Sequence, residues 1–412
     1  MTPKKNDKTA DEARRLLASP DLFRQHLDAL KRNELVGEER YANVVYVTGV
    51  SRLLQRPLNL TAKGQSSTGK NHVIDQVLSL FPKDSVREIT STSAHAWNYS
   101  EDDFRHRVLY QQEIDQKSAA IRQVRQWISQ GRLIRTTTVR SNGEFKTKRF
   151  VAEGPIAAIS TTTRNRLEID DETRHISIWT DESRQQTRRI LEAAFRQSEP
   201  LSRHERRVWR KTHSLLEARA SSSSIVFPSW VSAISDAAYD QNIRMRRYLV
   251  AFATACETVA LIRSFLPGHY DERKRRISVH FSDFAVTALL FAPVFEESLH
   301  RGTEKVDRTR EIVEHLVASK KGKAVGWRDI AAELQVSKDK AYRLLRDASA
   351  AGVICRCNKP EKGNSKLYRP TARPRFIPDP EELFHKLPQV GTTVKFVHPL
   401  TGKWVVYKRK KN

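Results

Sequence analysis

Residues 58–81 read LNLTAKGQSSTGKNHVIDQVLSLF, and this stretch decides the fold that we expect. Its first five residues predict a short strand that begins after Pro57. A glycine- and serine-rich loop follows over 64–71. The apolar residues after it have the spacing of one buried helix face: Val73, Ile74, Val77, Leu78 and Phe81. A strand, the pattern G-x-x-x-x-G-K and a helix, in this order, form the context that a phosphate-binding loop requires.

The loop residues indicate how a phosphate would be held. Glycines let the backbone curl so that successive N–H groups point inward, and the helix N-terminus adds partial positive charge. Lys70 would reach the β- and γ-phosphates of a nucleotide. The alternative is a Gly/Ser-rich turn that happens to carry a lysine, and both flanks disfavour it. The predicted binding residues are Gly64, Ser66, Ser67, Thr68, Gly69, Lys70 and Asn71.

Two positions that would hold a metal ion depart from the usual pattern. Asn71 stands where Ser or Thr normally holds Mg²⁺. An amide oxygen can also ligate a hard cation, although with different geometry. In the strand VLYQQEID, residues 108–115, Gln112 stands where a metal-holding Asp is expected, and Asp115 or a water could take over. Glu113 is the candidate base for the attacking water. A Glu-x-Asp pair can also be a solvated helix N-cap, but the phosphate loop favours catalysis.

A helix over 119–129 is expected to lead into a β-hairpin. Asn142-Gly143 separates two β-prone runs, 132–140 and 144–151, and both turn residues need positive φ. The arms carry many basic residues: Arg132, Arg135, Arg140, Lys146, Lys148 and Arg149. They fit either an edge hairpin protected by charge or a basic finger that grips a phosphate backbone. The next strand, 156–160, ends in Thr161-Thr162-Thr163, and a hydroxyl there could hold the attacking water.

The composition narrows the class of partner. The chain has 412 residues, enough for two to three domains at about 150 residues each, and a net charge of +25. This charge argues against an ordinary metabolic enzyme and favours a polyanion such as nucleic acid. We expect no apolar run long enough to span a membrane. Three cysteines cannot form a disulfide framework, so we expect a reducing cytoplasm, with Cys355 and Cys357 small and buried.

Strands that alternate with helices predict an α/β fold with a largely parallel, covered sheet. Strands are expected at 108–111, 156–160 and 175–180, and a helix at 182–196. The chain from 198 to 299 has a helical pattern that is interrupted by Ser221–Ser224, which resembles a linker. Five prolines between 370 and 388 then predict a stiff, non-helical connection to a basic tail with a possible hairpin.

The order of phosphate loop, acidic strand, helix, hairpin and polar-ended strand resembles AAA+ ATPases of the pre-sensor-1 hairpin group. It is most similar to minichromosome-maintenance (MCM) type helicases, and in particular to the helicase half of phage and mobile-element primase-helicases. The resemblance covers about 19–299, in segments such as SRLLQRPLNLTAKGQSSTGKN, RHRVLYQQEID, WISQGRLIRTTTV, VAEGPIAAISTTT and ETRHISIWTDESRQQTRRI. It implies an AAA+ core over 41–200 after a helical leader, 1–40, and a helical lid over 201–304.

The resemblance also implies roles. Lys70 would bind the phosphates of ATP, which comes with Mg²⁺, and Glu113 would activate water. Thr161 or Thr162 would stand at the sensor-1 position. Arg174 would be an arginine finger that acts in a neighbouring subunit's site, which implies a ring, most often a hexamer. Arg246 or Arg247 would be the sensor-2 arginine of the lid, and the hairpin would pull on single-stranded DNA in the channel. For the three arginines, ordinary surface charge is the alternative.

Residues 305–372 resemble a winged helix-turn-helix, followed by a Pro-rich linker and basic tail over 373–412. Ser337 can cap a third helix, 338–350, whose basic residues Lys338, Arg343 and Arg346 suit a DNA major groove. The alternative is a winged helix that makes protein contacts, and the basic face favours duplex DNA.

The sequence therefore predicts an ATP-dependent DNA helicase that replicates a phage or mobile genetic element, with any primase on a separate chain. The rival interpretation is a DNA-binding initiator or scaffold that binds ATP with little hydrolysis. Asn71 and Gln112 favour the rival, whereas Lys70, Glu113 and Arg174 favour the motor. A third hypothesis, an RNA-acting ATPase, fits the charge, but the winged helix favours DNA.

Overall fold

The computed structural model describes residues 8–89, 103–114, 119–141, 144–164, 167, 169–172, 174–195, 199–238, 245–300, 304–350, 353–357, 366–371 and 375–409. The chain divides into two compact units. The first comprises Met1–Phe295 and Phe376–Asn412, and the second comprises Glu296–Arg375.

A five-stranded sheet in the order β2-β3-β6-β1-β7 forms the centre of the first unit. All neighbouring strands in it are parallel. Its strands are β1 (Leu60–Lys63), β2 (Val86–Ile89), β3 (Arg107–Gln111), β6 (Ile156–Thr162) and β7 (Ile176–Trp179). Every residue of β1, β6 and β7 is buried, because helices cover both faces. The predicted α/β class with a parallel sheet is confirmed.

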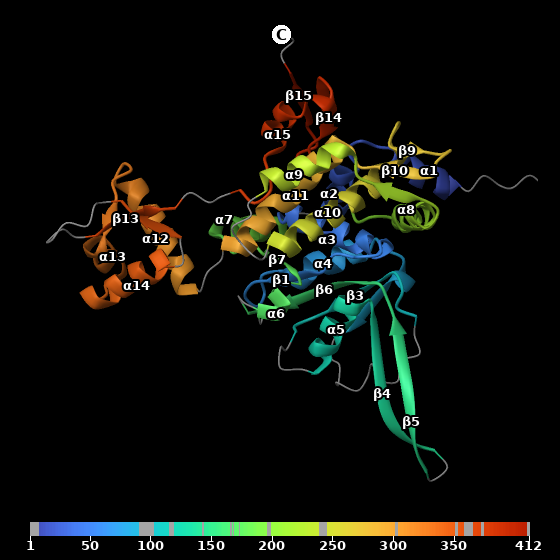
Figure 1. Cartoon of the computed structure of the whole chain (residues 1–412), viewed down its shortest axis with the longest axis horizontal. Helices are drawn as coiled ribbons and strands as arrows, with labels where there is room; N and C mark the ends of the chain where they lie inside the picture. Colours follow the sequence, from blue (N-terminus) through green and yellow to red (C-terminus); the bar gives the residue numbers. More distant parts are fainter. Residues whose placement is uncertain are drawn as a thin grey trace, which may run out of the picture. The chain divides into compact units, whose positions relative to one another are not determined.

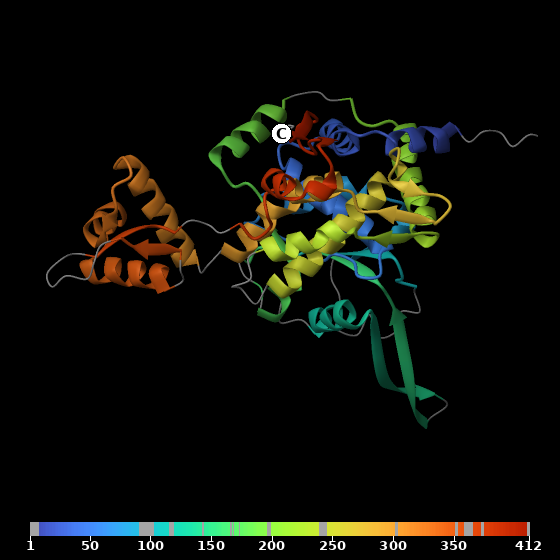
Figure 2. The same cartoon turned by 45° about the horizontal axis from the view of Figure 1, so that its top comes forward.

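Helices cover the two faces of the sheet as separate layers (Figures 1 and 2). On one face lie α3 (Glu39–Val50) and α4 (Lys70–Leu78), and on the other lie α5 (Ala119–Gln130) and the short α6 (Ile169–Glu172). The helix α3 is buried along its whole central length and contacts both α4 and β6. The phosphate-binding loop thus joins the buried strand β1 to the helix α4, and α3 packs against α4.

Two long antiparallel strands, β4 (Arg132–Ser141) and β5 (Glu144–Glu153), project away from this sheet (Figure 1). Their register runs from Arg132 opposite Glu153 to Ser141 opposite Glu144. The predicted turn residues, Asn142 and Gly143, lie outside the described residues.

Helices and a second small sheet complete the first unit. The helices are α1 (Lys8–Leu17), α2 (Leu22–Arg32), α7 (Arg184–Ala193), α8 (Arg203–Ser221), α9 (Ser232–Ala237), α10 (Met245–Ile262) and α11 (Phe281–His300), of which α11 crosses the unit boundary. The sheet consists of β8 (Ser224–Val226), β10 (Arg276–Ser278) and β9 (Tyr270–Asp271). The expected linker at Ser221–Ser224 is therefore wrong in part, because Ser224 already pairs with Arg276.

One segment of the described chain, Met245–Phe265, is long and apolar enough to cross a membrane. This corrects the expectation that no such run exists. However, 67% of its apolar window is buried inside the protein. The apolar residues of α10 are thus explained by core packing, and nothing in the described part of the chain indicates a membrane.

The C-terminal residues belong to the first unit. The expected stiff, non-helical connection is wrong, because it contains a helix, whereas the possible hairpin is present as an antiparallel pair. The C-terminal residues form α15 (Pro380–Lys386), β14 (Thr393–Val397) and β15 (Trp404–Lys408). Pro380 does not break α15, because it stands in the first turn, where no intrahelical N–H bond is lost. The Asp379 side chain caps this helix.

The second unit contains three helices and a three-stranded antiparallel sheet. The helices are α12 (Glu304–Ser319), α13 (Trp327–Leu334) and α14 (Lys338–Ala350), and the strands are β11 (Val325–Gly326), β12 (Ile354–Arg356) and β13 (Leu367–Pro370), in the order β11-β13-β12. Their apolar faces share one core around Val313, Ile330 and Leu345. Cys355 and Cys357 are exposed, contrary to expectation, because β12 lies at the sheet edge.

Candidate active site

The loop between β1 and α4 has the backbone of a phosphate cradle. Gly64, Ser67 and Gly69 all have positive φ, which curls the chain around the N-terminus of α4. A Cβ at Gly64 would lie 2.3 Å from the Thr180 hydroxyl, so only glycine fits there. The Thr180 and Thr68 hydroxyls are 2.9 Å apart, which ties the loop to the end of β7.

Lys70, the first residue of α4, is buried beneath this loop. Its Nζ donates to the carbonyl oxygens of Gly64, at 2.8 Å, and Gln65, at 2.5 Å. Burial lowers the pKa of Lys70, whereas attraction to Glu113 and Glu182 opposes this shift. The ammonium group therefore sits inside the loop, where an anionic oxygen would stabilise its charge.

Glu182, which the sequence analysis did not identify, contacts the same loop. Its Oε1 accepts the Gln65 backbone N–H at 2.7 Å. A carboxylate oxygen thus already uses one amide donor of the cradle, which demonstrates that the loop suits an anion. No local signal points to Glu182, since 117 residues separate the partners.

Asn71 and Gln112, the two neutral residues at the expected metal positions, lie side by side. Asn71 Nδ2 and Gln112 Oε1 are 3.4 Å apart, and Gln112 Nε2 donates to Glu88 Oε1 at 2.7 Å. The Asn71 Oδ1 is buried and has no hydrogen-bond partner among the described residues. An orphaned amide oxygen beside a phosphate cradle fits a Mg²⁺ ligand. Asp115 lies outside the described residues.

Glu113 has a strained backbone just beyond β3. Its φ is +47°, and its N–H donates to the Thr161 hydroxyl at 3.0 Å. The next N–H, of Ile114, donates to the Thr161 carbonyl at 2.9 Å. Thr161 therefore holds the Glu113 backbone through its hydroxyl, and the role of that hydroxyl toward the attacking water stays a prediction. The Glu113 side chain is exposed at this edge of the sheet, while Thr162 is buried and accepts the Arg164 N–H.

A buried ion pair joins the strand before the loop to α6. Lys63 Nζ lies 2.6 and 2.7 Å from the two carboxylate oxygens of Glu172. Glu172 also accepts from Ser177 and from the Leu167 N–H, so its oxygens are well satisfied. These contacts lower the pKa of Glu172 despite its burial. The sequence analysis missed this pair because its members are 109 positions apart.

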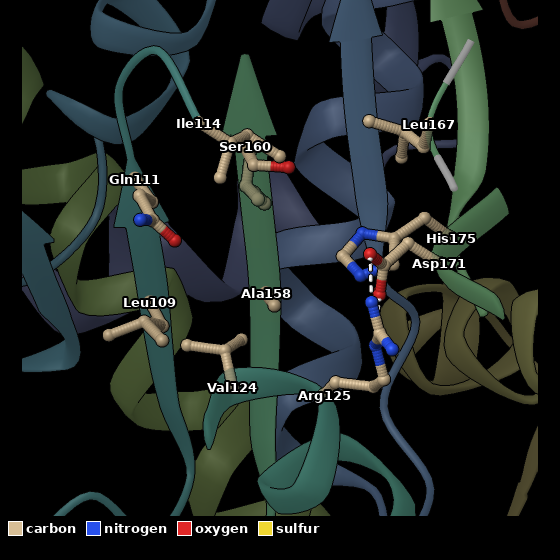
Figure 3. A pocket seen from close by; sticks show the side chains of 11 residues that line it. Leu109, Gln111, Ile114, Val124, Arg125, Ala158, Ser160, Leu167, Asp171 and His175 are labelled. Carbon is tan, nitrogen blue, oxygen red and sulfur yellow. Dashed lines mark hydrogen bonds and ion pairs between the residues drawn. The ribbon is translucent and has the colours of Figure 1, made fainter. Parts of the chain in front are cut away.

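The neighbouring carboxylate of α6 binds the helix that leads into the hairpin. Arg125 on α5 makes two 2.6 Å hydrogen bonds to Asp171 (Figure 3). A second contact joins Arg174 Nε to the Ser129 hydroxyl on α5 at 3.0 Å. The cavity drawn in Figure 3 has a volume of about 20 Å³, room for roughly one water. It is part of the packing between these elements and cannot hold a nucleotide.

Arg174, Arg246 and Arg247 line one open cavity of about 460 Å³, together with Arg56. Its wall includes residues 57–59, just before β1, and Ile176 at the start of β7. Lys70 instead follows the end of β1. Arg246 and Arg247 thus lie at the amino-terminal ends of the sheet strands, whereas the phosphate loop of their own chain follows a carboxyl-terminal end. The expectation that they contribute to the nucleotide site therefore does not hold within one chain.

The predicted DNA-binding residues fall into two groups. The hairpin residues Arg135, Arg140, Lys146 and Lys148 belong to β4 and β5, of which the structure describes only the backbone at these positions. In the second unit, Lys338, Arg343 and Arg346 are exposed on α14. There Lys338 lies over the Trp327 ring, which stacks on Tyr342.

Comparisons with known proteins agree with the phosphate-binding geometry. Residues 7–201 match the model of a family described as "MTBMA_p00010 P-loop domain". No curated protein matches the sequence. A solved structure described as "SCCmec type IV Cch - active helicase" is similar at 13% identity, with a TM-score of 0.34, over 87% of this chain and 70% of that one. The family match and the loop geometry together indicate a P-loop domain of the nucleotide-binding type over residues 7–201.

Proposed function

We propose that this protein is an ATP-driven DNA translocase of the MCM-like AAA+ type, a helicase in the replication of a phage or mobile element. One observation carries the proposal. The Asn71–Gln112 contact brings the helix that begins at Lys70 against the end of β3, where Glu113 follows. Phosphate-binding lysine and candidate base thus meet at the carboxyl edge of one parallel sheet, which is where ligands bind in such folds.

The chemistry follows from these groups. Lys70 and the loop N–H groups would hold the β- and γ-phosphates, and Glu113 would accept a proton from the attacking water while the bond to the β-phosphate oxygen breaks. The strained backbone of Glu113, fixed by Thr161, would hold the carboxylate in place. Asn71 would ligate Mg²⁺, which neutralises phosphate charge when bound.

The arginine cavity supports a ring. Arg174, Arg246 and Arg247 gather at the edge of the sheet that does not hold the phosphate loop. Guanidinium groups in an open cavity suit phosphate oxygens. If a second copy placed its loop there, these arginines would complete its site in trans, and a head-to-tail repeat of this contact with a closing rotation would form a ring.

The remaining elements suit DNA. The antiparallel pair β4–β5 carries the predicted basic residues along its length and would act as the pre-sensor-1 hairpin in the channel. Helices α8 to α11 would form the lid. The second unit would act as a winged helix, with α14 in the major groove of duplex DNA. ATP hydrolysis would then move the hairpins along one strand.

The test is steady-state ATP hydrolysis by the full chain, with and without single-stranded DNA. We expect Lys70→Ala to lose nucleotide binding, and Glu113→Gln to bind ATP but hydrolyse it about 10²- to 10⁴-fold more slowly. The same proteins are then assayed for release of an annealed oligonucleotide. If wild-type protein binds ATP but shows no DNA-stimulated turnover, the result would favour the initiator or scaffold. The neutral side chains of Asn71 and Gln112 also favour that interpretation.

A further inference from the structure

The C-terminal ribbon, β14 and β15, presents an aromatic and basic face that the proposed motor does not use. Cross-strand pairs place Thr393 with Lys408, Lys395 with Val406, and Val397 with Trp404 on one face. Trp404 is 62% exposed and Val406 41% exposed on this face, whereas Val397, the cross-strand partner of Trp404, is buried. Tryptophan is enriched at binding interfaces, because its ring offers a large apolar surface and its N–H can still donate a hydrogen bond.

The opposite face of the ribbon fixes it to the core. Phe396 and Tyr407 are buried and their rings pack 5.5 Å apart, and Tyr407 packs on Phe384 of α15. The turn that joins the strands is held by Asn43 of α3, which donates to the Pro399 carbonyl at 3.1 Å. Arg409 closes the end of the ribbon with bonds to the Phe384 and Leu387 carbonyls. The outward face is therefore a rigid platform.

The charge of the ribbon identifies the kind of partner. Residues 391–412 contain six Lys and Arg and no Asp or Glu. Lys395, Lys403 and Lys408 are exposed and make no salt bridge with any other described residue. The acidic side chains nearest the ribbon, Asp379 and Glu381, lie on the side of its buried face. Burial and the negative charges of these two side chains raise the pKa of Tyr407 on that face to about 12. The exposed face is thus left with positive charge around a flat aromatic ring.

We propose that this face binds single-stranded nucleic acid, with a base stacked on Trp404 and the backbone phosphates near Lys395, Lys403 and Lys408. A stacking ring beside several cations is how proteins hold single strands without reading sequence. A duplex buries its base faces and could not stack, so the site selects unpaired strands. This binding would not require ATP, so an experiment can disprove it without affecting the proposed ATPase function.

The first experiment measures binding of a fluorescein-labelled dT oligonucleotide to the full chain by anisotropy, without nucleotide. Loss of one stacked base corresponds to about 1–3 kcal/mol, so we expect Trp404→Ala to weaken binding about 5- to 150-fold, while Trp404→Phe retains most of it. The matched control is Phe195→Ala, which removes an aromatic ring that is 90% exposed on the same unit. Equal loss in both alanine variants would overturn the proposal, and no loss in either, together with no crosslink in the measurement below, would overturn it as well.

A second measurement locates the contact even if the hairpin or the second unit dominates affinity. Photo-crosslinking with a dT oligonucleotide that contains 5-iodouracil should attach it to the peptide that carries Trp404. Absence of a crosslink between 391 and 409 contradicts a nucleic-acid site. If Trp404→Ala instead changes the sedimentation of the protein alone, the face is a contact between copies, and the proposal is wrong.

Discussion

At the scale of single residues, the nucleotide site is unusual for its neutral metal positions. Asn71 and Gln112 contact each other, and the nearest carboxylate in their hydrogen-bond chain is Glu88. The amide oxygen of Asn71 can bind a hard cation, but it brings no charge. Under the proposed function, a Mg²⁺ ion at Asn71 would gain no negative charge from Asn71 or Gln112, and the nucleotide phosphates would supply most of it.

An exchange of Glu88 and Gln112 tests this view. In Glu88→Gln combined with Gln112→Glu, the net charge and the hydrogen bond between the two positions are kept, but the carboxylate moves next to Asn71. We expect the Mg²⁺ concentration that half-saturates ATP hydrolysis to fall by about tenfold, which corresponds to about 1.4 kcal/mol. A magnesium titration of turnover measures it. An unchanged or higher requirement would mean that Gln112 does not stand at the metal.

The residues that sequence alone identified are those whose signal is local. Lys70 and the glycines form one short motif between a strand and a helix, and Glu113 ends a strand. Glu182 and the Lys63–Glu172 pair were missed, because their contacts join positions 117 and 109 apart. Thr161 was identified for its hydroxyl, but its partner, the Glu113 N–H, depends on two strands lying side by side.

At the scale of elements, α6 connects the nucleotide loop to the hairpin. Its Glu172 binds Lys63, which directly precedes the loop, and its Asp171 binds Arg125 on the helix before β4. Arg174, just after α6, contacts the same helix through Ser129. These contacts make α6 a physical link between the loop and the helix before the hairpin, and a substitution tests whether the link couples them.

Replacing Asp171 with Asn should separate basal ATP hydrolysis from its stimulation by single-stranded DNA. Hydrolysis without DNA should stay within about threefold of wild type, because the nucleotide loop is untouched. Stimulation by single-stranded DNA should be lost, and stability should fall by up to about 3 kcal/mol, because Arg125 loses a charged partner. The control is Asp103→Asn, which breaks an exposed ion pair with Arg105. Full DNA stimulation in Asp171→Asn would rule out this role for α6.

The hairpin itself can be tested by a double substitution. Lys146 and Lys148 lie two positions apart on β5, opposite Val139 and Thr137, and so share one face. Replacing both with Ala should reduce DNA-stimulated turnover and leave ATP binding intact, since no phosphate-loop residue changes. Lys83→Ala with Lys274→Ala removes the same charge from exposed positions elsewhere in the unit. Equal effects of the two double variants would indicate general electrostatics and no specific finger.

Elements were predicted well where they are long and periodic, and poorly where they are short. Four of the five sheet strands, α4 and α5 follow from apolar spacing, whereas the edge strand β2, Val86–Ile89, was not predicted. The strands β8 to β10 have only two or three residues each, too few for a pattern. The C-terminal ribbon was expected as a possible hairpin, and β14 pairs with β15 in that way. The helix α15 was overlooked although Asp379-Pro380 is a local start signal, since the prolines around it were interpreted as a stiff connection.

At the scale of the whole molecule, the first unit has several buried histidines. His26 and His175 are fully enclosed, and burial lowers the pKa of each to about 4. His269 has its pKa lowered to about 4 as well, mainly by burial. In the unfolded chain these imidazoles have their ordinary pKa of about 6.5. The unfolded state therefore binds protons first as the pH falls.

This difference predicts acid destabilisation in a defined range. The stability is fully present above about pH 6.5 and is lost as the pH falls from there toward 4, because only the unfolded state is protonated in this window. At pH 5 each of these three histidines costs about 2 kcal/mol, on the order of 6 kcal/mol together, which is comparable to the stability of a whole domain. His213 is also fully buried with its pKa well below the ordinary value, so it adds to this cost. Urea unfolding at pH 7.5 and pH 5, followed by circular dichroism, measures the loss in free energy of unfolding.

His26→Gln should reduce the difference in free energy of unfolding between the two pH values by about 2 kcal/mol. The control is His315→Gln, at an exposed position of the second unit, which should leave this difference unchanged. A urea midpoint that is the same at both pH values would show that the buried histidines are protonated in the folded protein or that water reaches them.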